Sequence, residues 1–165
     1  MSITVKGVER IVPNLWFDHN AEEAVDYYLS IFKDGKILDK AHYPTEGLAD
    51  FQKEFAGKVL TINFELNGLQ FMAINAGSEF KFNESVSFLV NCKDQDEIDY
   101  YWEALTKDGG EESVCGWLKD KYGLSWQIAP EMIDTLVTKN PKAFSTMMQM
   151  KKIIIADIEK AAEEK

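Results

Sequence analysis

The stretch "PNLWFDHNAEEAVDYYLSIF", residues 13–32, decides the fold because a related stretch, "VSFLVNCKDQDEIDYYWEAL", occupies residues 86–105. A shift of 73 positions brings Asp26-Tyr27-Tyr28 onto Asp99-Tyr100-Tyr101. Similarity within one chain at a fixed spacing is typical of a duplicated structural unit. The sequence therefore predicts two copies of one supersecondary pattern.

Each copy is predicted to begin with a strand followed by a helix. The apolar helix positions recur at the spacing i, i+3, i+4, i+7, which indicates one buried stripe per helix. They are Val25, Tyr28, Leu29 and Phe32 in the first copy and Ile98, Tyr101, Trp102 and Leu105 in the second. Before each helix an alternating run (Pro13-Leu15-Phe17, then Val86-Phe88-Val90) predicts a half-buried strand.

Further strands follow each helix. In the first copy we expect strands at 36–43, 59–66 and 69–74, with Asn67-Gly68 as a hairpin turn. In the second, the glycines after Asp108 end the helix, and strands are expected at 114–119 and 125–129 around an Asp-x-x-Gly turn. Both copies are interpreted as strand, helix, strand, strand, strand. Pro130 fits the first turn of a helix, and a mostly helical tail is expected after it.

Composition limits the class of protein. A chain of 165 residues with 45% hydrophobic residues fits a single domain, 1–165, with module one at about 10–76, module two at about 84–129 and the tail at 130–165. The net charge of -10 disfavours nucleic acid as a partner. No apolar run is long enough to span a membrane, and the amino terminus lacks a signal-peptide pattern. With two cysteines that form no disulfide or zinc pattern, we expect a cytoplasmic protein.

The duplicated βαβββ modules, the Asp-Tyr-Tyr helix and the Asp-x-x-Gly turn resemble the vicinal oxygen chelate superfamily, which includes glyoxalase I, bleomycin-resistance proteins and extradiol dioxygenases. The resemblance covers roughly residues 10–130. Together with "CGWLKDKYGLSWQIAP" and "MMQMKKIIIADIEKA", the first stretch is similar to the PhnB-like branch, often labelled 3-demethylubiquinone-9 3-methyltransferase. It implies an α+β fold of two tandem modules whose curved mixed sheets surround a cleft, usually in a dimer.

The resemblance also implies where a metal site belongs. Metal-dependent relatives place His or carboxylate ligands on the first and last strands of each module. The last-strand position, four residues after Gly123, is Gln127 here, and the other matching strand positions carry no histidine or carboxylate. We therefore expect no metal and no cofactor. The same resemblance implies that Asn14, Trp16, Met72, Ser87, Trp117 and Gln127 line the cleft and bind a small organic ligand.

Other chemistry-bearing residues have simpler interpretations. His19, in the turn before the first helix, and His42, near the end of a strand, are expected to be ordinary surface histidines, with His42 the better candidate for a role. Cys115, assigned to a strand, is expected to be a buried structural cysteine without an activating base. Asn20 and Glu23 have the spacing of a helix start and are expected to cap it. The catalytic residues are unknown.

Three functions stay open at this point. The first is a metal-independent protein that binds a small molecule, similar to bleomycin-resistance members. The second is a metal-dependent lyase or dioxygenase with an atypical ligand set that includes His42 and Gln127. The third is the methyltransferase of the family label, although no glycine-rich strand-to-helix loop for a nucleotide-like cofactor occurs. The methionine-rich tail, with Phe144, Met147, Met148 and Met150, predicts a homodimer.

Overall fold

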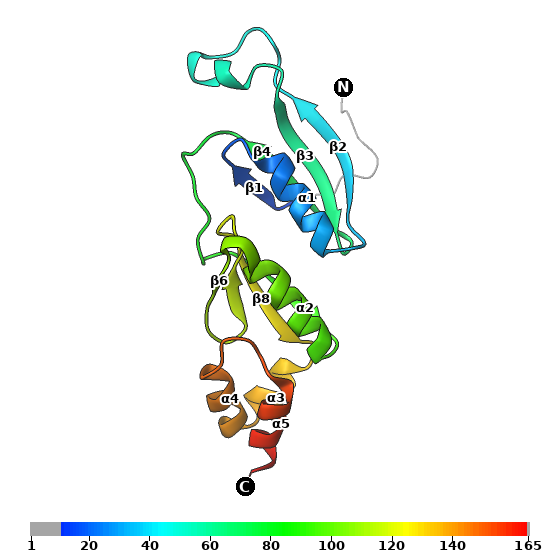
Figure 1. Cartoon of the computed structure of the whole chain (residues 1–165), viewed down its shortest axis with the longest axis vertical. Helices are drawn as coiled ribbons and strands as arrows, with labels where there is room; N and C mark the ends of the chain where they lie inside the picture. Colours follow the sequence, from blue (N-terminus) through cyan, green and yellow to red (C-terminus); the bar gives the residue numbers. More distant parts are fainter. Residues whose placement is uncertain (1–10, 165) are drawn as a thin grey trace. The chain divides into compact units, whose positions relative to one another are not determined.

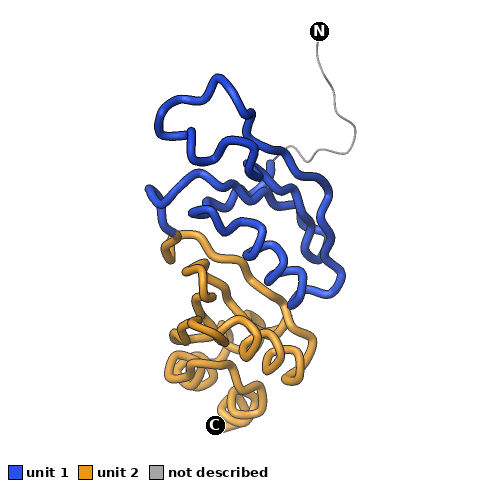
Figure 2. The backbone as a smooth tube through the Cα atoms, turned by 45° about the horizontal axis from the view of Figure 1, so that its top comes forward, with its two compact units in different colours: residues 1–81 blue, residues 82–165 orange. Residues whose placement is uncertain are grey.

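The computed structural model describes residues 11–164, which form two compact units divided between residues 81 and 82 (Figure 2). Each unit contains one four-stranded mixed sheet and one long helix packed on it (Figure 1). The predicted α+β fold of two tandem βαβββ modules is confirmed. The organisation of the whole chain as one domain stays a prediction.

Unit 1 contains the first module. Its elements are β1 (Asn14–Phe17), α1 (Ala21–Ile31), β2 (Lys36–His42), the 3-10 helix η1 (Asp50–Phe55), β3 (Val59–Leu66) and β4 (Leu69–Asn75). The strand order is β1-β4-β3-β2, with β1 parallel to β4 and the other pairs antiparallel. A parallel pair needs a long connection. Here that connection contains α1, β2 and β3, and β1 lies at one edge of the sheet beside β4.

Unit 2 repeats this order and adds the tail. Its elements are β5 (Ser87–Cys92), α2 (Gln95–Thr106), the 3-10 turn η2 (Lys107–Gly109), β6 (Glu111–Glu112), β7 (Trp117–Lys119), β8 (Ser125–Pro130), α3 (Ile133–Thr138), α4 (Pro141–Met148) and α5 (Ile155–Glu163). The strand order β5-β8-β7-β6 is that of unit 1, again with the first strand parallel to the last. The duplication in the sequence is thus a duplication of topology, and the mostly helical tail is confirmed.

The repeated apolar stripe forms the core of each unit. Val25 and Tyr28 of α1 and Ile98 and Leu105 of α2 are all fully buried, and each contributes about 1.5–3 kcal/mol of hydrophobic stabilisation. Leu29 and Tyr101 are the exceptions, because each is only half-buried. The repeat therefore specifies the same helix-on-sheet packing twice, with one less buried position in each copy.

The Asn67-Gly68 hairpin is confirmed. Both residues have positive φ, 50° and 79°, as a type I′ turn requires. The turn pairs Leu66 with Leu69 and thereby sets the register of β3 against β4 along their whole length.

The strand expected at 114–119 is wrong in its first half. Cys115 and Gly116 have positive φ, 55° and 81°, and lie in a turn, so that only Trp117–Lys119 form β7. The backbone N–H groups of Cys115 and Gly116 donate to Met150 and Lys151 of the tail. The fourth strand of this sheet is instead the separate two-residue β6, which pairs antiparallel with β7.

The expectation for Pro130 is also wrong. Pro130 is the last residue of β8, is paired with Cys92 of β5 and is buried, whereas α3 begins at Ile133. The pairing of β8 with β7 has already ended at Gln127, so the missing N–H of Pro130 removes no bond on that side. The next N–H, of Glu131, donates to the Cys92 carbonyl at 3.0 Å.

The start of α1 is capped by a different residue from the one expected. Asn20 occupies the N-cap position, but its side chain makes no capping hydrogen bond. The Ala21 N–H donates instead to Oδ1 of the buried Asn75 on β4, at 2.8 Å. Asn75 Nδ2 also donates to the Val59 carbonyl at 3.1 Å, and one amide therefore joins α1, β3 and β4. Among residues 11–164, no helix has the length and apolar character needed to cross a membrane.

Candidate ligand-binding site

Three of the residues expected to bind a ligand, Asn14, Trp16 and Met72, lie on the face of the unit 1 sheet opposite α1. The other face packs on the helix, with the rings of Phe64 and Tyr28 stacked at 6.5 Å. Side chains alternate between faces along a strand. The half-buried or exposed residues of β1 and β4 therefore share the opposite face, except Leu69 at the hairpin end of β4.

A polar row crosses all four strands on this face. The register places Asn14, Met72, Asn63 and Asp39 side by side, and we call these four residues the cross-sheet row. Asn14 Nδ2 donates to the Met72 sulfur at 3.3 Å, and Asn63 Nδ2 donates to Asp39 Oδ1 at 2.9 Å. Asn63 Oδ1 is buried and has no partner within residues 11–164.

The orientation of the Asn63 amide follows from its neighbour. A carboxylate only accepts, so the amide nitrogen faces Asp39 and the oxygen is the atom left over. Sequence reasoning missed Asn63 and Asp39. The Asn67-Gly68 turn contained the signal for Asn63, because its register places Asn63 opposite Met72.

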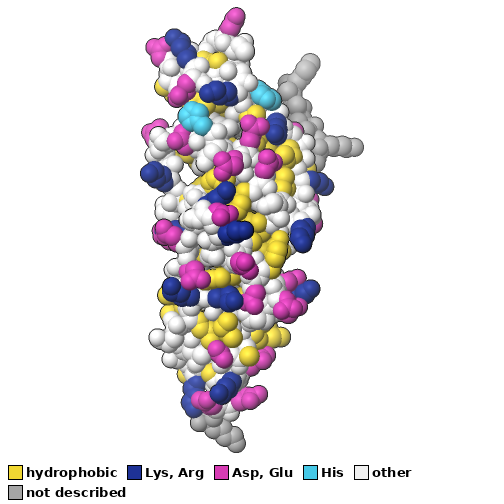
Figure 3. Space-filling view, viewed as in Figure 1, with side chains coloured by type: hydrophobic (Ala, Val, Ile, Leu, Met, Phe, Trp, Pro, Cys, Tyr) yellow, Lys and Arg dark blue, Asp and Glu magenta, His cyan; other side chains and the backbone are white. Residues whose placement is uncertain are grey.

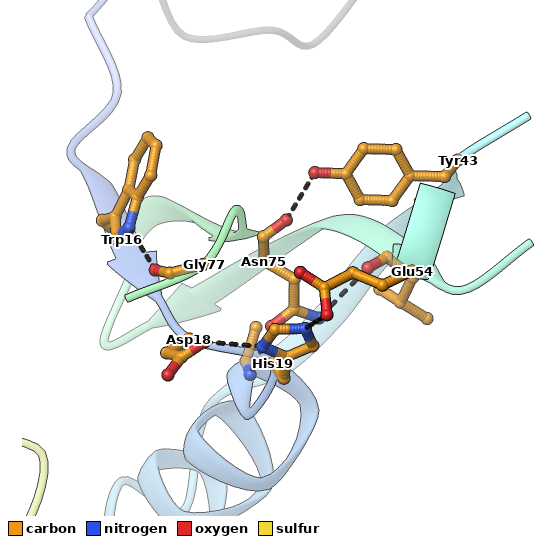
Figure 4. Close-up of polar contacts among 9 residues, drawn as sticks. Trp16, Asp18, His19, Tyr43, Glu54, Asn75 and Gly77 are labelled. Atoms are coloured by element: carbon orange, nitrogen blue, oxygen red, sulfur yellow. Dashed lines mark hydrogen bonds and ion pairs between the residues drawn. The ribbon is translucent and has the colours of Figure 1, made fainter. Parts of the chain in front are cut away.

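The indole N–H of Trp16 is not available to a ligand. Its indole N–H donates to the Gly77 carbonyl at 2.8 Å (Figure 4), and its ring meets Phe80 edge-on at 4.8 Å. The N–H is therefore engaged within the protein. Trp16 presents an apolar, half-buried ring to this face and not a free donor.

The other three expected residues, Ser87, Trp117 and Gln127, lie on the face of the unit 2 sheet opposite α2. Gln127 pairs with Trp117 on one side, and its Nε2 donates to the Ser87 hydroxyl at 2.9 Å. Ser125 shares this face and is paired with Ser87 in the register. It is 1% exposed, and its hydroxyl has no partner within residues 11–164.

The structure thus groups the six expected residues by unit, three on each sheet. Among residues 11–164, two buried side-chain polar atoms lack a hydrogen-bond partner, Asn63 Oδ1 and Ser125 Oγ, and each lies on one of these two faces. An unsatisfied buried polar atom costs about 1–3 kcal/mol and calls for an explanation. The single cleft that the resemblance implies for all six residues stays a proposal.

The Asp-x-x-Gly turn before β8 has a structural role. Asp120 is 2% exposed, and its Oδ1 accepts the N–H groups of Tyr122 at 2.9 Å and Leu124 at 3.1 Å. Its Oδ2 accepts the indole N–H of Trp126 at 2.9 Å. Gly123 supplies the positive φ of 83°. The turn aligns β8 and hence fixes the position of Gln127.

Both histidines contribute to one pocket of unit 1. The histidine pocket, as we name it, has a volume of about 410 Å³. Its lining residues are His19, Glu22, His42, Phe55, Gly57, Lys58, Val59 and Asn75. Figure 3 shows both histidines at the surface among acidic and basic side chains. The prediction of two surface histidines did not foresee that they share a pocket.

His19 is held between two carboxylates. Its Nδ1 lies 2.5 Å from Asp18 Oδ1, and its Nε2 lies 3.7 Å from Glu54 Oε2 (Figure 4). Its ring stacks on Phe55 at 4.4 Å. His42, by contrast, makes no side-chain hydrogen bond or ion pair with any residue from 11 to 164.

The two cysteines differ in environment. Cys92 is buried, and burial, followed by the charges of Glu97, Asp94 and Glu131, raises the pKa of its thiol to about 12. Cys115 is half-buried, so the expectation of a buried cysteine there is wrong, and its sulfur lies 3.4 Å from that of Met148. Within the described part of the chain, no three His, Cys, Asp or Glu side chains are grouped to hold a metal ion.

Comparison with known proteins places these features in context. The family model for 3-demethylubiquinone-9 3-methyltransferase matches residues 9–129. A PhnB protein from Bacillus cereus, named for the same activity, is 32% identical, with a TM-score of 0.62 over 73% of this chain and 98% of that one. No curated protein matches the chain.

Two more distant structures share the fold. A protein from Pseudomonas aeruginosa is 20% identical, with a TM-score of 0.57 over 74% of this chain and 98% of its own. The fosfomycin resistance protein FosX from Listeria monocytogenes, solved with Mn(II) and sulfate, is 15% identical, with a TM-score of 0.50 over 76% of this chain and 92% of its own.

Proposed function

Because this chain belongs to the PhnB-like 3-demethylubiquinone-9 3-methyltransferase family, whose members have the vicinal oxygen chelate fold, we propose that it binds a small organic molecule through the sheet faces opposite α1 and α2. The proposed ligand-binding residues are Asn14, Trp16, Met72, Ser87, Trp117 and Gln127, now joined by Asn63 and Ser125. Binding without a metal ion is part of the proposal.

One observation carries this function. Asn63 Oδ1 and Ser125 Oγ are buried without partners, and both lie beside residues that the family resemblance selects. On unit 1, a ligand that supplies an N–H or O–H donor would satisfy Asn63 Oδ1, and on unit 2 a hydrogen-bonding group would satisfy Ser125 Oγ. Each face also offers an apolar neighbour for the body of a ligand, Met72 beside Asn63 in unit 1 and Trp117 beside Gln127 in unit 2.

Methyl transfer is not part of the proposal. The two strand-to-helix turns, Asp18-His19-Asn20 and Lys93-Asp94, contain no glycine and so lack the loop with which a nucleotide-like cofactor is usually bound. The metal-dependent alternative depends on Gln127, a neutral ligand that contributes no charge to a coordination shell. Elemental analysis of the gently purified protein separates the metal-dependent alternative from metal-independent binding. A content of about one Zn, Ni, Fe or Mn per chain would reject metal-independent binding.

Ser125→Ala tests the unpartnered hydroxyl directly. The free protein should be as stable as the wild type or more stable by up to about 1 kcal/mol, because a buried hydroxyl without a partner is removed. At the same time, the thermal shift produced by active members of a panel of small aromatics and quinones should shrink. A loss of more than about 1 kcal/mol would mean that the hydroxyl is satisfied within the fold, against the proposal.

Gln127→Glu tests a second residue on the same face of the unit 2 sheet as Ser125. The volume barely changes, but a carboxylate next to Ser87 would alter the panel of neutral or anionic compounds that shift the melting temperature. Gln149→Glu, at the exposed residue that follows α4, adds the same charge elsewhere and should leave the panel unchanged. Identical profiles for all three proteins would remove Gln127 from the proposed site.

We also propose that the protein is cytoplasmic and forms a homodimer. Phe144 and Met148 of α4 are 48% and 45% exposed, which is unusual for large apolar side chains on one short helix and suits a contact with a second copy. Sedimentation at micromolar concentration tests the assembly. A monomer under these conditions would contradict the dimer.

A further inference from the structure

The histidine pocket is a second site on unit 1, separate from the residues proposed above to bind a ligand. It is bordered by the turn between β1 and α1, the end of β2 and the segment that leads from η1 into β3. Its volume of about 410 Å³ falls in the range of small-molecule pockets, about 300–1,000 Å³. None of its lining residues belongs to the cross-sheet row.

The pocket wall is fixed before any ligand arrives. The Phe55 ring is stacked between His19 at 4.4 Å and Tyr43 at 5.1 Å. The Tyr43 hydroxyl donates to the Asn75 carbonyl at 2.7 Å (Figure 4), and its N–H donates to the Lys58 carbonyl at 2.9 Å. These contacts attach η1 and the following segment to the sheet, so little ordering is needed on binding.

Each acidic group at this pocket already contacts a lysine or histidine side chain. Glu22 Oε1 accepts from Lys40 Nζ at 3.1 Å. Asp18 and Glu54 both face His19, at 2.5 Å and 3.7 Å. A carboxylate engaged in this way repels an incoming anion less than a free one does.

Two hydrogen-bond donors at the pocket, the side chains of His42 and Lys58, remain without partners among residues 11–164. The side chains of His42 and Lys58 both line the pocket, and neither makes a hydrogen bond or an ion pair with any residue from 11 to 164. An ammonium group only donates hydrogen bonds, and an imidazole donates from at least one nitrogen. The hydrogen-bond donors of His42 and Lys58 that face the pocket are therefore suited to a negatively charged acceptor.

We propose that the histidine pocket binds a small organic anion, whose carboxylate or phosphate group is held by His42 and Lys58. Charge-assisted hydrogen bonds from these two side chains provide the main attraction. Val59 and the edge of Phe55 are buried apolar neighbours for the body of the ligand. Gly57, which lies between Phe55 and Lys58 in the lining, has a positive φ of 70°.

The test uses the full chain labelled with 15N and two probes, benzoate and inorganic phosphate, titrated separately. The amides of Gly57 and Lys58 should shift saturably with at least one probe, and the probe that saturates at the lower concentration identifies the headgroup. His42→Ala and Lys58→Ala should each weaken that probe by at least about five-fold, as expected for the loss of one charge-assisted hydrogen bond. Saturation by neither probe would overturn the proposal.

Two control variants separate a site from general charge. Lys139→Ala removes the same charge from an exposed position in unit 2 and should leave the titration unchanged. Glu22→Gln removes a negative charge and frees Lys40 from its partner, so binding should tighten. An equal loss in Lys139→Ala and Lys58→Ala would refute a specific site. Responses at Asn63 or Gln127 report the separate site of the proposed function, and the two proposals can fail independently.

Discussion

Replacing Asp120 with asparagine removes one charge from the turn before β8 and changes little else in volume. Oδ1 of the new amide can still accept from the N–H groups of Tyr122 and Leu124, but the amide nitrogen then faces the indole N–H of Trp126. Two donors oppose each other there. Trp126 is 3% exposed, so water cannot replace the lost acceptor.

The magnitude follows from these contacts. An unsatisfied buried donor costs about 1–3 kcal/mol, and the two remaining bonds weaken because their acceptor is no longer charged. The amide is easier to bury than the carboxylate, which offsets part of the loss. We expect Asp120→Asn to lower the free energy of unfolding by about 2–3 kcal/mol, measured by urea denaturation followed by far-UV circular dichroism.

A double-mutant cycle checks the mechanism. Trp126→Phe removes the opposed donor, so the double variant Asp120→Asn/Trp126→Phe should be less destabilised than the sum of the two single variants by about 1–2 kcal/mol. Asp134→Asn, at an exposed position of α3, makes the same charge change and should stay within about 0.5 kcal/mol of the wild type. Additive single effects, or a loss below about 1 kcal/mol in Asp120→Asn, would refute the assigned contact.

Two further measurements probe the turns and the cysteines. Gly68→Ala and Gly116→Ala both force alanine into positive φ (79° and 81°), but the two sites differ in space. A Cβ at Gly116 would lie 2.6 Å from the Ile128 carbonyl oxygen, whereas a Cβ at Gly68 would meet no atom of the described residues within 4 Å beyond its chain neighbours. We expect losses of about 1–2 kcal/mol at Gly68 and clearly more at Gly116 in the same urea assay, and equal losses would contradict the close approach. A thiol reagent at pH 8 should modify Cys115 in the native protein but reach Cys92 only after unfolding, because burial and the neighbouring carboxylates raise the pKa of Cys92 to about 12. The raised pKa keeps the Cys92 thiol protonated in the folded state, so the stability that the buried thiol contributes is complete below about pH 9 and is lost as the pH rises toward 12. Rapid modification of both cysteines in the native state would refute the burial of Cys92.

The sequence by itself determined the module and its repetition. Helix periodicity, strand alternation and the Asn67-Gly68 turn are local patterns, and each is set by residues within one or two turns of chain. That is why α1 and α2 were placed with their buried stripes, and why β3 matches its expected range of 59–66. The side-chain faces of Asn14, Met72 and Gln127 follow from the same alternation.

Only the tertiary structure decided the contacts between distant segments. The cap of α1 comes from Asn75 and not from the adjacent Asn20, because a neighbouring strand presents a better acceptor than the local side chain does. Backbone bonds from the tail hold Cys115 in a turn where a strand had been expected. His19 and His42 line one pocket because α1 packs on the sheet to which β2 belongs, and no local pattern records that approach. Such pairings depend on strand register and packing across the whole unit, which a chain read in short windows does not contain.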